Sequence, residues 1–134
     1  MTIMLQGSET RMSIRPNDGD AMELDCRYVL HIPLSKWENG EVVPLDVDDE
    51  IEELIFCLEV QGFDGFYLTK VKSYYKSRRY DELLVTIFAE EDEGPCEIFR
   101  DWFFRHNDVL RQEAFAVEVN NRMIIGQMGF DIEG

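Results

Sequence analysis

A regular alternation of apolar and polar residues between Glu23 and Leu34 restricts the fold of this chain more than any other feature. The apolar residues recur at every second position: Leu24, Cys26, Tyr28, Leu30, Ile32 and Leu34. Side chains two residues apart on a strand point to the same face, so this period predicts a strand with one buried and one mostly wet face. Pro33 has no amide hydrogen to donate, so we expect the strand end to lie at an edge or to leave the sheet.

Two helices are expected from apolar stripes that follow acidic residues. Carboxylates in the first turns of a helix meet the positive end of its dipole. The first stripe, which would end before Gly62, consists of Ile51, Leu54, Ile55 and Leu58. The second helix is expected to begin near Gly94-Pro95 and to end near His106-Asn107. Its stripe consists of Ile98, Phe99, Trp102 and Phe103.

The remaining segments predict four more strands. Two of them, 63–73 and 81–90, are joined by a connection over 74–80, and two others, 113–119 and 122–128, by a tight turn at Asn120-Asn121. The order β-α-β-β-α-β plus one strand predicts an α+β fold, namely a ferredoxin-like split sandwich. Its antiparallel sheet would carry both helices on one face and a C-terminal hairpin strand. We expect one domain over 22–130, with a loose arm or short added strand over 1–21 and a tail over 131–134.

The charge of the chain is strongly negative. Its 134 residues include 28 Asp and Glu against 13 Lys and Arg, which gives a net charge of −15. Nucleic acids and anionic membranes would repel such a surface, so direct binding to either is not expected. The three cysteines form no CxxC pair, and no signal peptide or membrane span is expected, so the sequence predicts a cytoplasmic protein with reduced thiols.

No known catalytic motif is present in the sequence. The chain lacks GxSxG, HExxH and Cys–His patterns and a glycine-rich phosphate loop. His31 falls on the polar side of the first strand, and His106 is expected to cap the second helix. Carboxylates are too abundant for any one pair to indicate acid–base catalysis. The sequence therefore predicts a non-enzymatic protein with no catalytic residues, metal or cofactor.

The acidic residues at the two helix starts form the leading candidate site for a partner. We expect the two starts to share one side of the molecule and to present a negative ridge that resembles a phosphate backbone. This predicts a binding protein that occupies a basic surface of a protein partner, such as a nucleic-acid-binding protein. Its sharpest form is a phage or mobile-element anti-defence inhibitor (anti-CRISPR or anti-restriction) that mimics nucleic acid, a class it resembles in size and charge. The residues are Asp48, Asp49, Glu52, Glu53, Glu91, Asp92 and Glu93.

A basic, tyrosine-rich stretch provides an alternative site. Residues 66–80 contain no acid and carry a charge of +5. Cations beside aromatic rings suit phosphates and stacked bases, although such cations also discourage edge pairing at a hairpin tip. The run 66–88 is similar to the strand–loop–strand section of PII-like and CutA-like regulatory proteins, which implies a homo-oligomer that binds a phosphorylated ligand or nucleic acid here. The long loop of PII proteins is absent. The anion-binding residues would be Lys70, Lys72, Lys76, Arg78, Arg79, Tyr74 and Tyr75.

Overall fold

The computed structural model describes residues 24–90 and 94–128, so the predicted arm 1–21 and tail 131–134 lie outside the described residues. The described part is a mixed α+β fold with two helices, a five-stranded sheet and a two-stranded sheet. Its elements are β1 (Cys26–Pro33), β2 (Ser35–Glu38), β3 (Glu41–Pro44), α1 (Asp48–Val60), β4 (Phe66–Tyr75), β5 (Arg78–Ala89), α2 (Cys96–Leu110), β6 (Ala114–Val119) and β7 (Arg122–Gln127).

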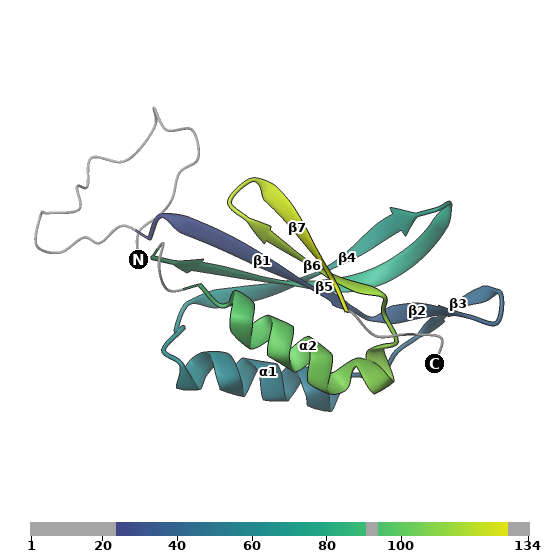
Figure 1. Cartoon of the computed structure of the whole chain (residues 1–134), viewed down its shortest axis with the longest axis horizontal. Helices are drawn as coiled ribbons and strands as arrows, with labels where there is room; N and C mark the ends of the chain where they lie inside the picture. The colour runs from purple at the N-terminus through teal and green to yellow at the C-terminus, as the bar shows by residue number, and fades with distance from the viewer. Residues whose placement is uncertain (1–23, 91–93, 129–134) are drawn as a thin grey trace, which may run out of the picture.

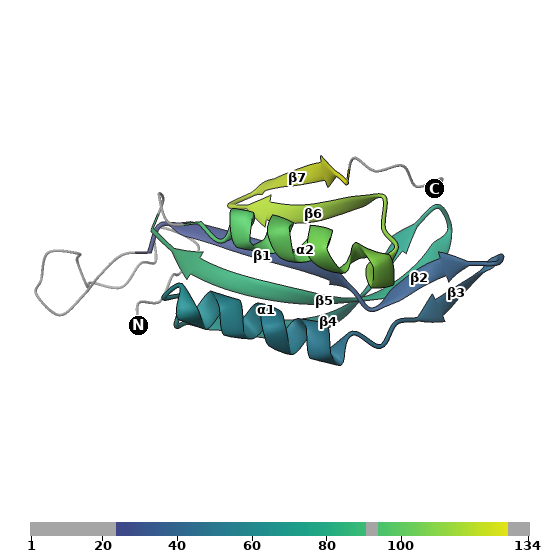
Figure 2. The same cartoon turned by 60° about the horizontal axis from the view of Figure 1, so that its bottom comes forward.

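The main sheet has the strand order β4-β5-β1-β6-β7, and every neighbouring pair in it is antiparallel. Both helices lie on the same side of this sheet (Figures 1 and 2). The predicted α+β class is therefore confirmed, as is the C-terminal hairpin strand, which is β7. We call the sheet face opposite the helices the open face, and no helix of residues 24–90 and 94–128 covers it (Figure 2).

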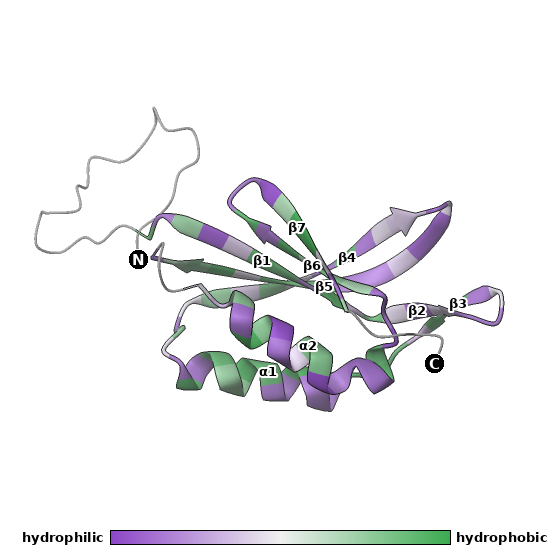
Figure 3. Ribbon diagram, viewed as in Figure 1, coloured by the Kyte–Doolittle hydropathy of each residue, from purple (hydrophilic) through white to green (hydrophobic). Residues whose placement is uncertain are grey.

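The core forms because β1 alternates as its sequence predicts. Its even-numbered residues from Cys26 to Ile32 join the core beneath the helices, and its odd-numbered residues face the other way. Figure 3 shows this alternation along the sheet strands. The largest fully buried side chains come from α2 and are Phe99, Trp102 and Phe103. Each helix thus buries one apolar stripe against the sheet.

Two hairpins differ from the sequence-based expectation. The turn Asn39-Gly40 joins β2 and β3 into a separate hairpin that we did not predict, with φ angles of 55° and 84°. The segment 74–80 is not a loop, because β4 and β5 continue to a two-residue turn at Lys76 and Ser77, with φ angles of 54° and 64°. Two such residues allow a turn whose twist matches the strands, so pairing continues to the tip.

The second helix also runs further than predicted. It continues past His106 to Leu110 and ends where Arg111 adopts a left-handed conformation, with φ of 56°. The buried side chain of Asn107 supports this end. Its amide nitrogen donates to the carbonyl of Gln112 at 2.9 Å, and its oxygen accepts from the Gln112 amide at 2.9 Å. Asn107 is thus a buried capping residue inside the helix rather than its last residue.

Gly62 ends α1 as expected, and this supports a stability prediction. It has φ of 97°, and the amides of Gly62 and Phe63 donate to the carbonyls of Glu59 and Leu58, the bonding pattern of a Schellman cap. We expect Gly62→Ala to lower the free energy of unfolding by about 1 kcal/mol, because a Cβ is unfavourable in this conformation. Chemical denaturation would measure the loss.

Gly65 provides the matched control for Gly62. It also lies between α1 and β4 and has open space where a Cβ would lie, but it lacks a positive φ. Gly65→Ala should therefore leave the midpoint of unfolding nearly unchanged. Equal effects of the two substitutions would contradict a conformational role for Gly62.

Within the described residues, no helix has both the length and the apolar character to cross a membrane.

Candidate functional site

A histidine held between two glutamates lies on the open face of the sheet. His31 is on the central strand β1, Glu82 on its neighbour β5 and Glu118 on its other neighbour β6. The register pairs His31 with Leu84 and with Ala116, so each glutamate is one diagonal step from His31 on the same face. We call these three residues the His–Glu cluster.

Both ring nitrogens of His31 meet a carboxylate. Nδ1 lies 3.3 Å from Oε1 of Glu82, and Nε2 lies 2.8 Å from Oε2 of Glu118. The three side chains are largely buried, with exposed fractions of 17% for His31, 26% for Glu82 and 28% for Glu118. Only the imidazolium form has a proton on each nitrogen, so this arrangement favours a charged His31.

The glutamates raise the pKa of His31 above its ordinary value near 6.5. Burial, the largest single influence, lowers the pKa, but the hydrogen bonds and charges of Glu82 and Glu118 together outweigh it. Arg27 adds a second cation, with Nη1 3.9 Å from Oε1 of Glu118. The cluster therefore combines two carboxylates and a proton donor on one sheet face, with the Arg27 guanidinium beside it.

This raised pKa predicts how the cluster affects stability as the pH changes. A group with a raised pKa in the folded state stabilises the protein fully below its unfolded pKa and loses that effect as the pH rises through the folded value. The stability of the wild type relative to His31→Gln should therefore be highest below about pH 6 and fall by on the order of 1 kcal/mol toward pH 9. Urea unfolding of both proteins across this range would measure it.

Removal of one carboxylate provides a check on the cause. Glu118→Gln leaves the histidine in place and removes the nearer charge, at 2.8 Å. We expect the difference in unfolding free energy between Glu118→Gln and the double variant Glu118→Gln/His31→Gln to depend less on pH than the difference between wild type and His31→Gln. A stability difference between wild type and His31→Gln that stays constant with pH would contradict the charged hydrogen bonds.

A surface cavity lies beside strands β4 and β5. It has a volume of about 390 Å³ and is lined by Leu34, Lys70, Val71, Lys72 and Asp81. Val71 pairs with Glu82 across β4 and β5, and Asp81 precedes Glu82 in the chain. Lys70 and Lys72 pair with Leu83 and Asp81, and Leu83 belongs to the core beneath the helices, so these cavity residues face the helix side of the sheet and not the open face that carries the His–Glu cluster.

The acidic residues predicted to bind a partner do not form one ridge. Four of them lie in α1, whereas Glu91, Asp92 and Glu93 lie outside the described residues. The helices α1 and α2 are antiparallel, because they follow the antiparallel strands β1 and β5 in the chain. In agreement, Trp102 in the middle of α2 donates a hydrogen bond to the carbonyl of Glu50 near the start of α1. The helix starts therefore lie at opposite ends of the molecule (Figure 1), and the expectation that they share one side is wrong.

Glu53 also differs from a free surface carboxylate. It lies 2.6 Å from Nη2 of Arg105 and 2.6 Å from Nε2 of His106, so it joins α1 to α2. The hydrogen bond to His106, together with Arg105, lowers the pKa of Glu53 and outweighs the opposing effect of burial. His106 therefore joins the helices rather than capping α2, whereas Asp48, Asp49 and Glu52 stay exposed.

The residues predicted to bind anions come together on one hairpin. Lys70, Lys72, Tyr74 and Tyr75 lie on β4, Arg78 and Arg79 on β5, and Lys76 in the turn between them. We call residues 70–80 of this hairpin the basic arm. Lys72 forms an ion pair with Asp81 at 2.5 Å, and the Arg78 guanidinium lies 3.5 Å from the centre of the Trp37 ring.

The His–Glu cluster was missed because its signal in the sequence is weak. His31 was placed on the correct face, and Glu118 is the only charged residue in the apolar run from Ala114 to Val119. A lone charge at a strand position can indicate a site, but only the order β5-β1-β6 brings these three residues together. No group of three or more His, Cys, Asp or Glu side chains in residues 24–90 and 94–128 is placed to hold a metal ion.

Comparison with known proteins gives a likeness in fold. No family model and no curated protein sequence matches the chain. A solved structure of phage SAM lyase in the apo state aligns with a TM-score of 0.51 and 13% identity, over 79% of this chain and 91% of that chain. A structure of phage SAM lyase in complex with S-methyl-5'-thioadenosine aligns with a TM-score of 0.49 and 12% identity, over 79% and 92%.

These comparisons overturn two predictions made from the sequence. The prediction of a non-enzymatic binding protein, with its alternative of a PII-like regulatory domain, is contradicted, because a solved structure with a similar fold is a named lyase. The absence of a known motif was the basis for predicting no catalysis, and it does not support that conclusion in a fold that a lyase uses. At this level of identity the shared property is the fold.

Proposed function

We propose that this chain is an enzyme that cleaves S-adenosylmethionine (SAM), as a lyase, at the bond between its sulfonium sulfur and the amino-acid side chain. The convergence of Glu82 and Glu118 on the open face carries this proposal, since it places two carboxylates on a fold similar to that of phage SAM lyase. The products would be S-methyl-5'-thioadenosine and a four-carbon amino-acid fragment.

The chemistry of SAM suits such a site. Its sulfur carries a positive charge, which disappears when the electron pair of the carbon–sulfur bond moves to sulfur. Glu82 and Glu118 would attract the sulfonium and ammonium groups, and a carboxylate in a partly buried site holds a cation more strongly than one in water. A glutamate that also removed a proton from the adjacent carbon would yield an unsaturated amino acid. Attack by the carboxylate of SAM itself would instead yield a lactone.

We also infer that the fold is the ferredoxin-like one expected from the sequence. Without β2, β3 and β7, the sheet order is β4-β5-β1-β6, with α1 before β4 and α2 after β5. This is the split β-α-β-β-α-β arrangement with both helices on one face. The β2–β3 hairpin and β7 are then additions to that arrangement.

An anti-defence role would follow from the proposed reaction. An enzyme that consumes SAM removes the methyl donor that DNA-modifying and restriction systems use. Such an activity needs no contact with a nuclease, unlike the inhibitor that the sequence suggested. We place the reaction in the cytoplasm, the compartment expected for three cysteines that form no disulfide in the structure.

The test is direct detection of the reaction. Purified full-length protein is incubated with SAM, and S-methyl-5'-thioadenosine is quantified by liquid chromatography and mass spectrometry. We expect product in proportion to protein and time, well above the spontaneous breakdown of SAM. Elimination and lactone formation give isomeric four-carbon fragments of the same mass, so proton NMR or chromatographic comparison with authentic standards distinguishes them. Release at the spontaneous rate only would overturn the proposal.

A further inference from the structure

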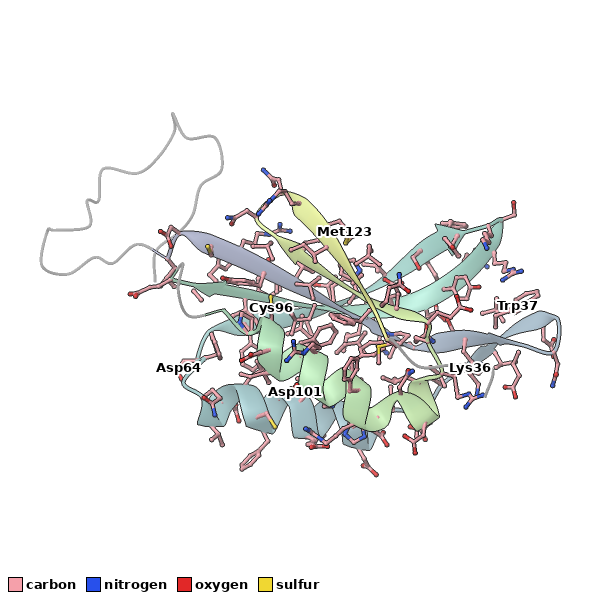
Figure 4. All side chains as sticks on the ribbon, in the orientation of Figure 1. Lys36, Trp37, Asp64, Cys96, Asp101 and Met123 are labelled. Atoms are coloured by element: carbon pink, nitrogen blue, oxygen red, sulfur yellow. The ribbon has the colours of Figure 1, made fainter. Side chains whose placement is uncertain are left out.

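The basic arm extends beyond the ends of the two helices. In both cartoon views the outer end of the β4–β5 hairpin passes the ends of α1 and α2 (Figures 1 and 2). Tyr74 and Tyr75 near the tip are 70% and 62% exposed. Arg78 of the basic arm contacts the ring of Trp37 on the β2–β3 hairpin, and Figure 4 shows Trp37 beside the arm.

Of the five cations of the arm, only Lys72 forms an ion pair within the described residues. Lys72 pairs with Asp81, and Lys76 lies 5.3 Å from the ring centre of its neighbour Tyr75. Lys70 and Arg79 form no ion pair with any residue of the described ranges 24–90 and 94–128. Exposed tyrosines next to arginines have the composition of protein-binding hot spots. The arm therefore has the composition of a surface that binds an acidic partner.

The start of α1 carries exposed negative charge, which is complementary to the charge of the basic arm. Asp46, Asp48, Asp49 and Glu52 are exposed, and none of them forms an ion pair with a described residue. These four residues, which we call the acidic patch, begin two residues after β3 ends, at the end of the molecule toward which the basic arm also extends (Figure 1). One molecule thus carries unpaired cations and unpaired carboxylates at one end.

We propose that the basic arm binds the acidic patch of a second copy of this chain. The basic arm, residues 70–80, carries +5 and the other residues together carry −20, so the chain itself supplies the complementary charge. Each copy has both surfaces, so two copies can exchange both contacts, as in isologous pairing. The screening length is about 8 Å at physiological ionic strength, so local attraction can exceed the repulsion between two acidic molecules.

The experiment is sedimentation analysis of the full chain and of two reversed-charge variants. The arm variant carries Lys76→Glu and Arg79→Glu, and the patch variant carries Asp48→Lys and Glu52→Lys. We expect the wild type to sediment above the 15.7 kDa monomer mass as its concentration rises. Each variant alone should associate at least about tenfold more weakly, because like charges then face each other.

A mixture of the two variants is the decisive sample. The acidic arm of one then meets the basic patch of the other, and the unchanged arm meets the unchanged patch, so both contacts are restored. We expect the mixture to regain association that neither variant shows alone. The matched control is Arg100→Glu, which reverses an exposed cation on α2 away from the arm and should associate as the wild type does.

Circular dichroism and thermal unfolding verify that both variants fold, and the regained association of the mixture would itself exclude misfolding. A monomeric wild type at all concentrations would overturn the proposal. So would variants that associate normally, or a mixture that stays monomeric. The inference does not rest on the proposed reaction, since Glu82 and Glu118 are unchanged in every variant.

Discussion

Replacement of Glu82 by glutamine is expected to reduce the rate of SAM cleavage by at least about a hundredfold. The substitution keeps the shape of the side chain and removes the charge that faces Nδ1 of His31 at 3.3 Å. Preorganised charges aimed at a reacting cation and side chains that transfer protons each contribute about 10²-fold or more to catalysis. Steady-state assays of S-methyl-5'-thioadenosine release by wild type and variant measure the loss.

Two further variants separate a role in the reaction from a role in folding. Glu118→Gln removes the second carboxylate and should cause a loss of similar size. Glu52→Gln removes an exposed carboxylate on α1, outside the cluster, and should leave the turnover number and KM unchanged. Melting temperatures of all three proteins verify folding. Full turnover by both folded cluster variants would exclude the His–Glu cluster as the site of the proposed reaction.

Trp102→Ala is expected to cause the largest loss of stability, about 3 to 5 kcal/mol. The Trp102 side chain is fully buried, and its ring centre lies 5.8 Å from that of Phe99 and 5.9 Å from that of Phe103. Its Nε1 also donates a hydrogen bond of 2.8 Å to the carbonyl of Glu50 in α1. Truncation would leave a cavity between the helices and the sheet and remove a link from α2 to α1. Urea unfolding measures the change.

Phe104→Ala on the same helix is the control for Trp102→Ala. Phe104 is 47% exposed, so its truncation removes little buried area and should cost less than about 1 kcal/mol. The loss of stability caused by Trp102→Phe should lie between these two losses, because phenylalanine keeps an aromatic ring but cannot form the hydrogen bond to Glu50. Similar losses from Trp102→Ala and Phe104→Ala would show that Trp102 is not central to the core.

Much of the fold could be predicted because its signals are local. The alternation before Pro33 predicted β1, and the apolar stripe before Gly62 predicted α1 and its end. The β2–β3 hairpin was missed because its strands have four residues each, too few for a clear period. The end of α2 was misplaced because Asn107, typical of a helix end, bonds from inside the helix to Gln112.

The prediction of a non-enzymatic binding protein was wrong because it was based on the strong excess of acidic residues. Abundant carboxylates made each one uninformative, and the two acidic helix starts drew attention to a ridge that antiparallel helices do not form. Glu118 is the only acidic residue of β6, whereas Glu82 follows Asp81 in β5 and is not distinguished from it by the sequence. Glu82 is 51 residues from His31, and Glu118 is 87 residues from it.

The sequence by itself determined the strand periods, both helices, the basic arm and the strong negative charge, since each depends on neighbours within a few residues. The tertiary structure decided which strands pair with β1, and so brought His31, Glu82 and Glu118 onto one face. It also decided that the helix starts lie at opposite ends. Strand order and helix direction follow from burial of the whole core, which minimises exposed apolar surface over distant segments, and no local pattern specifies them.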